Sequence, residues 1–446
     1  MGTYFHSVTL DESKCRGCTN CIKGCPTEAI RVRKSKARII NERCIDCGEC
    51  IRACPHHAKK AITDPFDTIY SYEYRIAIPA PSLYSQFKTA KSREQLLTAL
   101  KRLDFDDVYE VAKAAEIVSS ATRKLLKTEE LKKPLISSAC PAVVRLIQVR
   151  FPNLIENIVK IDSPMEVAAK IAKKNFLRKN NVNAEQVGVF FISPCAAKVT
   201  SVKAPFGNEK SNVDGVISIR DIYLRMLNSI NKVKENESFE LAGIEGVRWA
   251  NSGGESAALA TNKYLAVDGI HNVIKIFEEI ENDRLADIDF VEALACTGGC
   301  LGGPLAVENV YVAKTRLKKF LNIAEIKESN NRMDKERNEE AEEYDDIIWK
   351  MDVQHKPILK LDDDFEKAIK KLESLEKIDK ELPGLDCGAC GAPNCRALAE
   401  DIVRGIANET DCIFLLRQKV RALAMQMMEL EAKMPPVMDR EHEDGK

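Results

Sequence analysis

The stretch that decides the fold is FVEALACTGGCLGGP, residues Phe290–Pro304. It begins as an apolar run that predicts a buried strand, and it then breaks into Cys296-Thr-Gly-Gly-Cys300, a second glycine pair and Pro304. Glycines at this density let the backbone take positive φ and approach a ligand closely. Two cysteines in such a loop can face one ligand, but they are too few to complete a tetrahedral metal or cluster site. The missing ligands are therefore expected elsewhere in the chain.

Four further segments read as strands of an α/β domain, with helical segments 166–179 and 221–233 among them. These predicted strands are 75–79, 134–138, 187–193 and 247–250. In open α/β sheets, sites are built where the carboxyl ends of strands meet. Cys140 and Cys195 follow two of these ends, so we expect them to converge with Cys296 and Cys300. Four thiolates fit a structural zinc, a plain 4Fe–4S cluster or a larger cofactor.

Residues 1–62 contain an internal cysteine repeat in which gaps of two, two and three residues are followed by Cys-Pro. The two copies are Cys15, Cys18, Cys21 and Cys25, and Cys44, Cys47, Cys50 and Cys54. This spacing is typical of bacterial two-cluster ferredoxins, in which the fourth cysteine of each run ligates the other cluster. One 4Fe–4S cluster would then take Cys54 with the first three cysteines, and the other would take Cys25. A pair of zinc sites is the weaker alternative, since zinc rarely needs this spacing.

The composition narrows the class of protein. An apolar content of 45% allows a sizeable core, and a net charge of -1 argues against general nucleic-acid binding. No apolar run approaches the roughly 18–20 residues of a membrane span, and the N-terminus lacks the pattern of a signal peptide. Sixteen cysteines, grouped in a long chain without an export signal, favour metal over disulfides. We therefore expect a cytoplasmic protein that uses neither a membrane nor nucleic acid.

The C-terminal part carries a second kind of cysteine motif. A charged, helix-prone connector at about 331–380 precedes a compact, glycine-rich group made of Cys387, Cys390, Cys395 and, further on, Cys412. This group predicts a third 4Fe–4S module, with zinc as the alternative. Residues 413–433 then predict a strong helix with apolar residues at heptad-like spacing. Two interpretations stay open: a helix packed on its own small domain, or one that forms a homodimer or docks a partner.

With these motifs in view, residues 1 to about 325 resemble the FeFe-hydrogenases. That family holds the H-cluster, a 4Fe–4S cubane linked through one cysteine to a two-iron subsite with CO and cyanide ligands. By resemblance, Cys140, Cys195, Cys296 and Cys300 are the cubane ligands, and Cys300 bridges to the two-iron subsite. Lys198 resembles the lysine that pairs with one cyanide, and a cation facing an anion in a dry site is physically sensible. Pro81 and Ser82 resemble the stretch that holds the other cyanide.

The departures from that family are as informative as the matches. Catalytic members carry a proton-relaying cysteine where this chain has Ala139, which offers no side-chain proton. A loose alignment places Ser120 and Arg123 where catalytic members have glutamates of the proton path. Ser193 and Leu294 replace methionines, and the glycine run after Cys300 is short. Loss of a positioned proton relay typically costs about 10²–10⁴ in rate.

The resemblance is therefore to the sensory branch, which has an extra C-terminal cysteine motif. It implies a hydrogenase of low activity that binds H2, releases protons and electrons, and passes electrons through 4Fe–4S clusters to an electron carrier or regulatory partner. Two alternatives remain: an iron–sulfur protein of this fold without the two-iron subsite, serving cluster assembly or electron transfer, and an ordinary catalytic hydrogenase.

The expected architecture is α/β, and α+β over the whole chain. It comprises a ferredoxin domain at 1–62, a two-lobed H-cluster domain at 63–330, the connector at 331–380 and a helical iron–sulfur module at 381–446.

Overall fold

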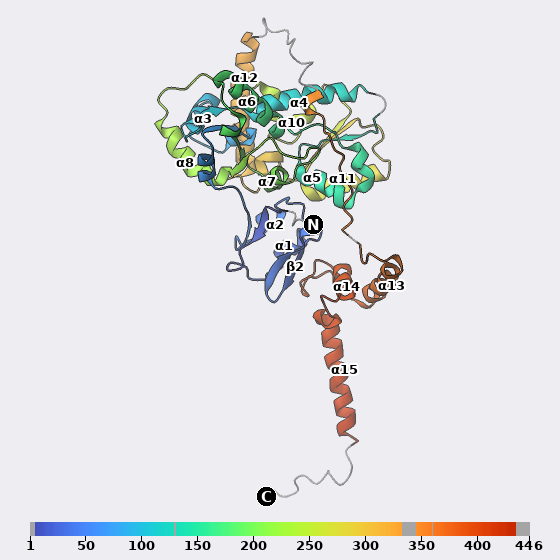
Figure 1. Ribbon diagram of the computed structural model, residues 1–446. Coiled ribbons are helices and arrows are strands. Elements are labelled where there is room, and N and C mark those ends of the chain that lie inside the picture. The colour runs from blue at the N-terminus through green and yellow to red at the C-terminus, as the bar shows by residue number, and fades with distance from the viewer. Residues whose placement is uncertain (1–4, 129–130, 332–344, 359, 434–446) are drawn as a thin grey trace, which may run out of the picture. The chain divides into compact units, whose positions relative to one another are not determined.

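The computed structural model describes residues 5–128, 131–331, 345–358 and 360–433 (Figure 1). The chain forms two compact units. The first unit comprises residues 1–14 and 41–358. The second comprises residues 15–40 and 359–446. Each unit is described by itself below. In the described residues, no helix is both long enough and apolar enough to cross a membrane.

The first unit carries most of the secondary structure. Its strands are β1 (Val8–Leu10), β4 (Lys59–Ala61), β5 (Tyr74–Pro79), β6 (Asp107–Val108), β7 (Leu135–Ile136), β8 (Val187–Ser193), β9 (Gly215–Ser218), β10 (Tyr264–Asp268) and β11 (Phe290–Leu294). Its α-helices are α2 (Glu49–Arg52), α3 (Arg93–Lys101), α4 (Val111–Leu126), α5 (Pro141–Arg150), α6 (Pro164–Asn180), α7 (Ala196–Lys203), α8 (Ile219–Lys232), α9 (Ile244–Arg248), α10 (Gly254–Ala257), α11 (Ile270–Glu281) and α12 (Val310–Asn331). Its 3₁₀ turns are η1 (Asn41–Arg43), η2 (Phe66–Ser71), η3 (Pro81–Ser85), η4 (Pro152–Asn157), η5 (Ala184–Gln186), η6 (Gly299–Gly302) and η7 (Asp345–Ile347).

Two parallel sheets give this unit its two lobes. One sheet has the strand order β6-β5-β8-β9 and the other has the order β10-β11-β7. The central strand β8 is buried along its whole length, as its continuous apolar sequence predicts for a parallel strand covered on both faces. The α/β fold and the two lobes expected from the sequence are thus confirmed.

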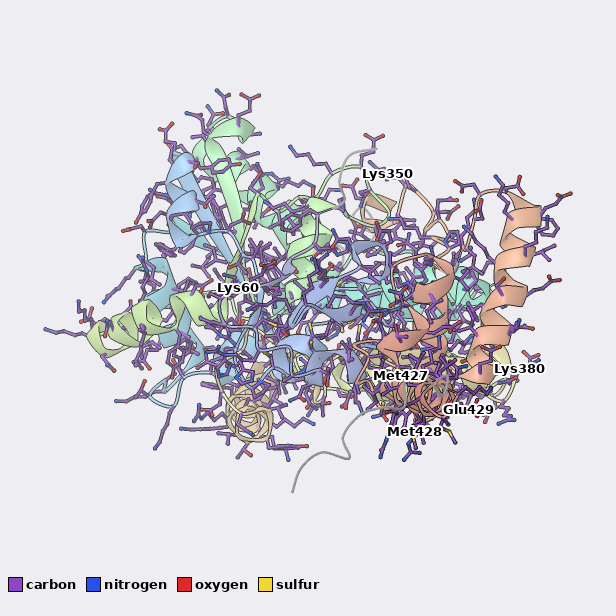
Figure 2. All side chains as sticks on the ribbon, turned by 90° about the horizontal axis from the view of Figure 1, so that it is seen from below. Lys60, Lys350, Lys380, Met427, Met428 and Glu429 are labelled. Atoms are coloured by element: carbon purple, nitrogen blue, oxygen red, sulfur yellow. The ribbon has the colours of Figure 1, made fainter. Side chains whose placement is uncertain are left out.

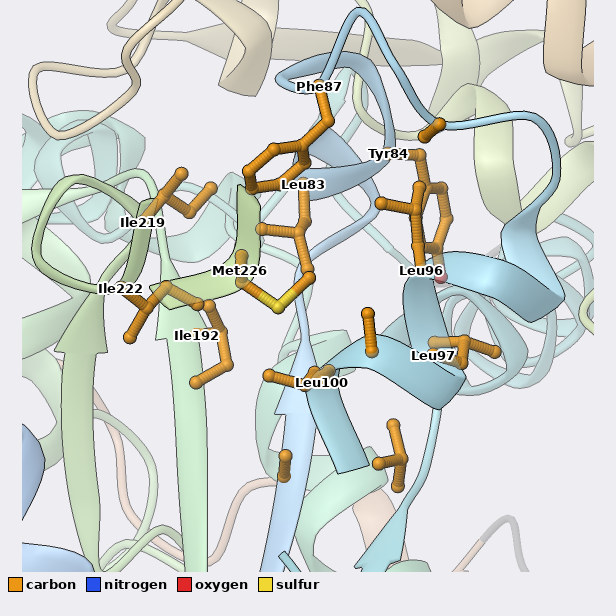
Figure 3. Close-up of a cluster of buried hydrophobic side chains, with 14 of the residues drawn as sticks. Leu83, Tyr84, Phe87, Leu96, Leu97, Leu100, Ile192, Ile219, Ile222 and Met226 are labelled. Carbon is orange, nitrogen blue, oxygen red and sulfur yellow. The ribbon is translucent and has the colours of Figure 1, made fainter. Parts of the chain in front are cut away.

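The helices bury apolar faces against these sheets. Around the first sheet, Figure 3 shows a cluster that joins the turn η3, helices α3 and α8, and strand β8. Its members include Leu83, Tyr84, Phe87, Leu96, Leu100, Ile192, Ile222 and Met226. Beside the second sheet, α5 and α11 pack together, with Phe151 and Phe277 in an edge-to-face contact at 5.5 Å between ring centroids (Figure 1). Such burial stabilises a core by about 1.5–3 kcal/mol per large side chain.

One predicted element was wrong. Residues 247–250 were expected to form a strand, but Ile244–Arg248 form helix α9. The buried residues Gly246, Val247 and Ala250 recur at helical rather than alternating spacing. A side chain at Gly246 would collide with the carbonyl oxygen of Ala112, so this glycine lets α9 pack closely on α4. Strands β9 and β10 were not predicted, and β6 is only two residues long.

The second unit is small. It contains α1 (Asn20–Lys23), β2 (Ile30–Arg33), β3 (Lys36–Ile39), α13 (Phe365–Glu381), α14 (Cys395–Val403), η8 (Glu409–Asp411) and α15 (Ile413–Glu431). Strands β2 and β3 form an antiparallel hairpin, and Asp401 of α14 accepts hydrogen bonds from Arg31 and Arg33, each at 2.7 Å. The helix expected at 413–433 is present as α15, but the connector expected at 331–380 lies partly outside the described residues. The predicted domain boundaries stay predictions.

Candidate metal centre

A cavity of about 80 Å³ in the first unit is lined by the four cysteines that were expected to converge. Cys140, Cys195, Cys296 and Cys300 all contribute to its wall. Apart from three charged residues, Lys198, Glu255 and Glu292, the rest of the wall is apolar, with Phe191, Trp249 and several alanines and prolines. The structure therefore brings these four residues together, as the argument from strand ends expected, although they follow strands of two different sheets.

Strand ends and helix starts position these thiols. Cys140 follows β7 and is the N-cap of α5, and Cys195 follows β8 and is the N-cap of α7. The unpaired N–H groups and the dipole at a helix start favour a thiolate over a thiol. A proline promotes each geometry, because Pro141 occupies the first position of α5 and Pro194 ends β8.

The loop that carries the other two cysteines depends on its glycines. Gly298 and Gly299 have φ values of 77° and 73°, which side-chain-bearing residues rarely adopt. A Cβ on Gly299 would lie 2.7 Å from the backbone nitrogen of Ser252, and one on Gly303 would collide with the carbonyl of Pro194. The dense glycines therefore serve both purposes expected of them, positive φ and close approach.

Burial raises the pKa of the thiols in this cavity. It raises the pKa of Cys300 to about 12 and raises that of Cys195 further. Burial also raises the pKa of Cys296, while the Arg52 guanidinium opposes that rise. Metal binding requires thiolates, so the apolar wall makes these groups costly to ionise unless a cation is bound with them.

Lys198 also faces the cavity. It belongs to α7, its side chain is largely buried, and its Nζ donates to the carbonyl oxygen of Ala139 at 3.2 Å. A buried ammonium with a neutral partner favours an anion nearby. Ala139 lines the same wall and adds no polar side chain there.

The turn η3 supplies Pro81 and Ser82. Pro81 lines the cavity, and Ser82 is fully buried in the next position. The Ser82 carbonyl accepts from Ser85 and Gln86, whereas its hydroxyl has no hydrogen-bond partner among the described residues. A buried hydroxyl without a partner costs free energy unless a ligand satisfies it.

Two carboxylates in the cavity wall were missed by the sequence analysis. Glu255 accepts from the Ser137 hydroxyl at 2.7 Å, and Glu292 accepts from the backbone nitrogens of Gly253 and Ser256 at 2.9 and 2.8 Å. Burial raises the pKa of both carboxyls, and their mutual repulsion raises that of Glu255 further. A glutamate in the middle of an apolar strand, as Glu292 is, was the signal that could have revealed the pair.

The positions that depart from the catalytic pattern have structural partners. Leu294 lines the cavity. The Ser193 hydroxyl accepts the N–H of Cys195 at 3.1 Å, so it fixes the turn that presents this cysteine. Arg123, on the outer part of α4, donates to the Ala258 carbonyl and pairs with Glu245, and Ser120 lies on the same helix.

The fourth cysteines of the two motif copies accept equivalent hydrogen bonds. Cys25 accepts the N–H of Ala29 at 3.2 Å, and Cys54 accepts the N–H of Ala58 at 3.3 Å, four residues later in each copy. Donors to sulfur favour the anionic, metal-binding form. How the eight cysteines pair into two clusters stays a prediction.

The C-terminal cysteines lie around the start of α14 and the end of η8. Cys395 begins α14, Cys412 is buried, and Cys387 is exposed. Gly388 and Gly391, between the first cysteines, have positive φ values of 76° and 80°. The N–H of Cys395 donates to Asp386 at 2.7 Å, which holds the loop against the helix.

Comparison with known families accounts for all three cysteine regions. The family model of the iron-only hydrogenase large subunit, C-terminal domain, matches residues 73–264 and 223–304, together more than half of the chain. A 4Fe–4S dicluster domain matches residues 7–55, and a model of an Fe–S cluster module matches residues 382–414.

Individual relatives are distant. Iron hydrogenase 1 of Clostridium pasteurianum is 24% identical over 282 residues, which cover 51% of this chain and 49% of that protein. The periplasmic Fe hydrogenase large subunit of Nitratidesulfovibrio vulgaris is 24% identical over 381 residues, covering 70% of this chain and 89% of that protein.

Among solved structures, an apo FeFe-hydrogenase HydA1 from Chlamydomonas reinhardtii aligns with a TM-score of 0.44 and 17% identity, covering 57% of this chain and 86% of that one. The chain thus spans about half the length of the first relative and most of the second. On the family match over residues 73–304, this iron–sulfur chain belongs to the family of the iron-only hydrogenase large subunit, C-terminal domain.

Proposed function

We propose that the chain is a sensory FeFe-hydrogenase of low activity. It binds H2 at an H-cluster, oxidises it slowly and reversibly to two protons and two electrons, and passes the electrons through 4Fe–4S clusters to a regulatory partner. The observation that carries this proposal is Ala139 in the cavity wall. Its carbonyl meets Lys198, while no side chain at this position can move a proton.

The residues that line the cavity, together with the buried Ser82 next to Pro81, fit an H-cluster. Four thiols face one space, the Lys198 ammonium has a single neutral carbonyl as its hydrogen-bond acceptor among the described residues, and the buried Ser82 hydroxyl has none. Thiolates suit iron, while a cation and a hydroxyl donor suit anionic ligands such as cyanide. Cys140, Cys195, Cys296 and Cys300 would hold the cubane, with Cys300 also reaching the two-iron subsite, and Lys198, Pro81 and Ser82 would hold the cyanides. When bound, the H-cluster supplies the metal chemistry that splits H2.

Because Ala139 cannot relay protons, another side chain must carry them in this protein. Glu255 is buried in the cavity wall, and its raised pKa lets it keep a proton near neutral pH. The Ser137 hydroxyl donates to Glu255 and also accepts the N–H of Ala139. We assign Glu255 the role of proton carrier, which releases its own proton before it takes up one from the cavity, and Ser137 that of orienting it. Without a relay at position 139, proton exchange is expected to be slow.

Infrared spectroscopy of the protein matured with the two-iron cofactor tests the proposal. We expect CO and cyanide bands that respond reversibly to H2 and CO, together with very low turnover. Turnover equal to that of catalytic members would contradict the sensory role.

The same experiment separates the two other candidate functions. An iron–sulfur protein without the two-iron subsite, acting in cluster assembly or electron transfer, would show no such bands after maturation. The dicluster match at 7–55 and the C-terminal module argue for a longer electron path than such a protein needs. An ordinary catalytic hydrogenase would show the bands and fast turnover.

The proposal also covers the electron acceptor and the cellular location. An electron carrier or a redox-coupled regulatory protein accepts them from the ferredoxin-type clusters or the C-terminal cluster. We propose a cytoplasmic location, in contrast to the relative named as periplasmic.

We also propose that α15 forms a homodimer with a second copy of this chain. The structure buries no residue of this helix, and Figure 2 shows the side chains of Met427, Met428 and Glu429 on it. Its apolar residues at heptad spacing are Ile413, Leu416, Val420, Leu423, Met427 and Leu430. Basic residues occupy its first half (Arg417, Lys419, Arg421) and acidic ones its second (Glu429, Glu431). Antiparallel pairing of two copies therefore matches opposite charges along a seam of about 28 Å.

A further inference from the structure

Arg52 connects two cysteine-bearing segments of the first unit. It is the last residue of α2, between Cys50 and Cys54 of the second ferredoxin-type run. Its guanidinium Nη1 lies 3.6 Å from the Sγ of Cys296 and 3.2 Å from the carbonyl oxygen of Gly302. A residue of the predicted ferredoxin cluster loop thus donates a hydrogen bond to a thiol of the candidate H-cluster site.

The position of this guanidinium is fixed from two sides. Glu49, one turn earlier in α2, accepts from Arg52 Nη2 at 2.7 Å and from Nε at 3.3 Å. At the start of α2, a Cβ on Gly48 would lie only 2.6 Å from the Pro304 ring, so the helix packs directly on the turn after Cys300. Arg52 therefore reaches Cys296 from a helix that is itself seated on the same loop.

The charge of Arg52 acts on Cys296. An N–H donor and a positive charge beside a cluster thiolate favour the more negative, reduced state of the cluster, and so raise its reduction potential. Glu49 acts in the opposite sense, because its carboxylate carries a negative charge and is held against the same guanidinium. The Arg52 and Glu49 side chains are each 29% exposed, so solvent moderates both effects without removing them.

We propose that Arg52 is a positioning residue that raises the reduction potential of the 4Fe–4S cubane held by Cys296. This inference rests on the proposed function for the identity of the cubane. It does not require the two-iron subsite or any turnover of H2.

The experiment is a potentiometric titration, followed by electron paramagnetic resonance, of full-length protein reconstituted with iron and sulfide but not with the two-iron cofactor. The signal absent from a Cys195→Ala protein identifies the cubane. In Arg52→Gln we expect the ratio of reduced to oxidised cubane, measured at the wild-type midpoint, to fall about tenfold, which is about 59 mV for one electron. Arg52→Lys restores part of the ratio, and Glu49→Gln raises it.

Arg284→Gln is the matched control, because Arg284 also pairs with a glutamate but on an exposed surface, where its side chain is 67% exposed. It should leave the cubane midpoint unchanged. An Arg52→Gln midpoint within the range of Arg284→Gln, or an equal shift of the other clusters, overturns the proposal. If Arg52→Gln does not fold, Glu49→Gln decides, and an unchanged or lowered midpoint in that variant overturns it. Missing CO and cyanide bands after maturation would contradict the proposed function but would leave this titration valid.

Discussion

The cavity cysteines and the C-terminal cysteines each form a group of four candidate ligands, but the two groups differ in how they are spread along the chain and in their burial. In the cavity, four thiols come from three strand ends spread between residues 140 and 300, and burial raises the pKa of three of them. In the C-terminal module, four thiols lie between residues 387 and 412, and Cys387 is exposed. A distributed, dry site depends on the whole fold and can hold reactive ligands away from water. A contiguous, partly exposed site is suited to exchanging electrons with a partner.

The largest expected effects come from removing one thiol from each of these two regions, because the two variants should lose different signals. Cys300→Ala should abolish the CO and cyanide bands of matured protein, because this residue is proposed to hold the two-iron subsite. Cys387→Ala should remove one 4Fe–4S cluster, measured as a loss of about four iron atoms per chain, and leave those bands intact. Bands that persist in Cys300→Ala would contradict the assignment.

Restoring a thiol at Ala139 should change the rate next most. Ala139→Cys supplies the missing proton relay beside Lys198 and should raise H2 turnover by about 10²-fold, measured as H2 evolution from reduced dye. Ala139→Ser is the matched control, since a hydroxyl of similar size does not titrate near neutral pH. Equal rates in wild type and Ala139→Cys would show that the relay does not limit turnover.

Neutralising Lys198 should weaken the binding of cyanide ligands in the cavity while leaving its four thiols in place. Lys198→Met should reduce the intensity of the cyanide bands by about tenfold, because a buried charge-assisted hydrogen bond contributes roughly 1.5–3 kcal/mol. Lys203→Met, at the exposed end of the same helix, should leave the intensity unchanged. If the two variants give the same spectra, Lys198 does not hold a cyanide.

The carboxyl of Glu255 makes the stability of the cavity depend on pH. Because burial raises its pKa above the ordinary 4.5, the folded protein keeps a proton that the unfolded chain releases, and stability falls as pH rises above about 4.5. Glu255→Gln removes this penalty. Its melting temperature should exceed that of wild type by about 2–4 °C at pH 8 and by less at pH 5.

Exposed Glu278→Gln is the control for that measurement. A Glu255→Gln advantage that stays the same between pH 5 and pH 8 would mean that Glu255 is charged in the folded protein across this range.

The smallest effect on stability is expected in α15. Leu423→Glu introduces a charge into the seam and should convert a dimer to a monomer in sedimentation experiments, with little change in melting temperature, because Leu423 is 59% exposed in the single chain. Met425→Glu, similarly exposed but on the other face of the helix, should leave the dimer intact. A wild-type protein that sediments as a monomer would contradict the homodimer.

The sequence predicted the parts of the site that depend on residue type and order. Strands 187–193 and 290–294, the dense glycines and the convergence of Cys140, Cys195, Cys296 and Cys300 follow from apolar runs and from the rule that sites form at strand ends. These signals are local, or they follow from a general property of parallel sheets.

Features that depend on packing between distant segments could not be predicted. Nothing local marks Ile244–Arg248 as a helix packed on α4, and nothing in α2 indicates that Arg52 reaches Cys296. The two-residue strand β6 is too short to have a pattern. Glu255 and Glu292 come together only because α10 lies against β11, although Glu292 in an apolar strand was a visible anomaly.

The placement of the cavity thiols on both sheets also has a consequence in polymer physics. A ligand bound by Cys140, Cys195 and Cys296 closes two chain loops, from 140 to 195 and from 195 to 296. Cross-links that close loops of this length restrict the unfolded chain by about 4 kcal/mol each in a chain-entropy estimate. A ligand bound by these cysteines would thus cross-link the two lobes. Without it, the lobes could unfold separately. Cofactor content and thermal resistance of the first unit should therefore rise and fall together.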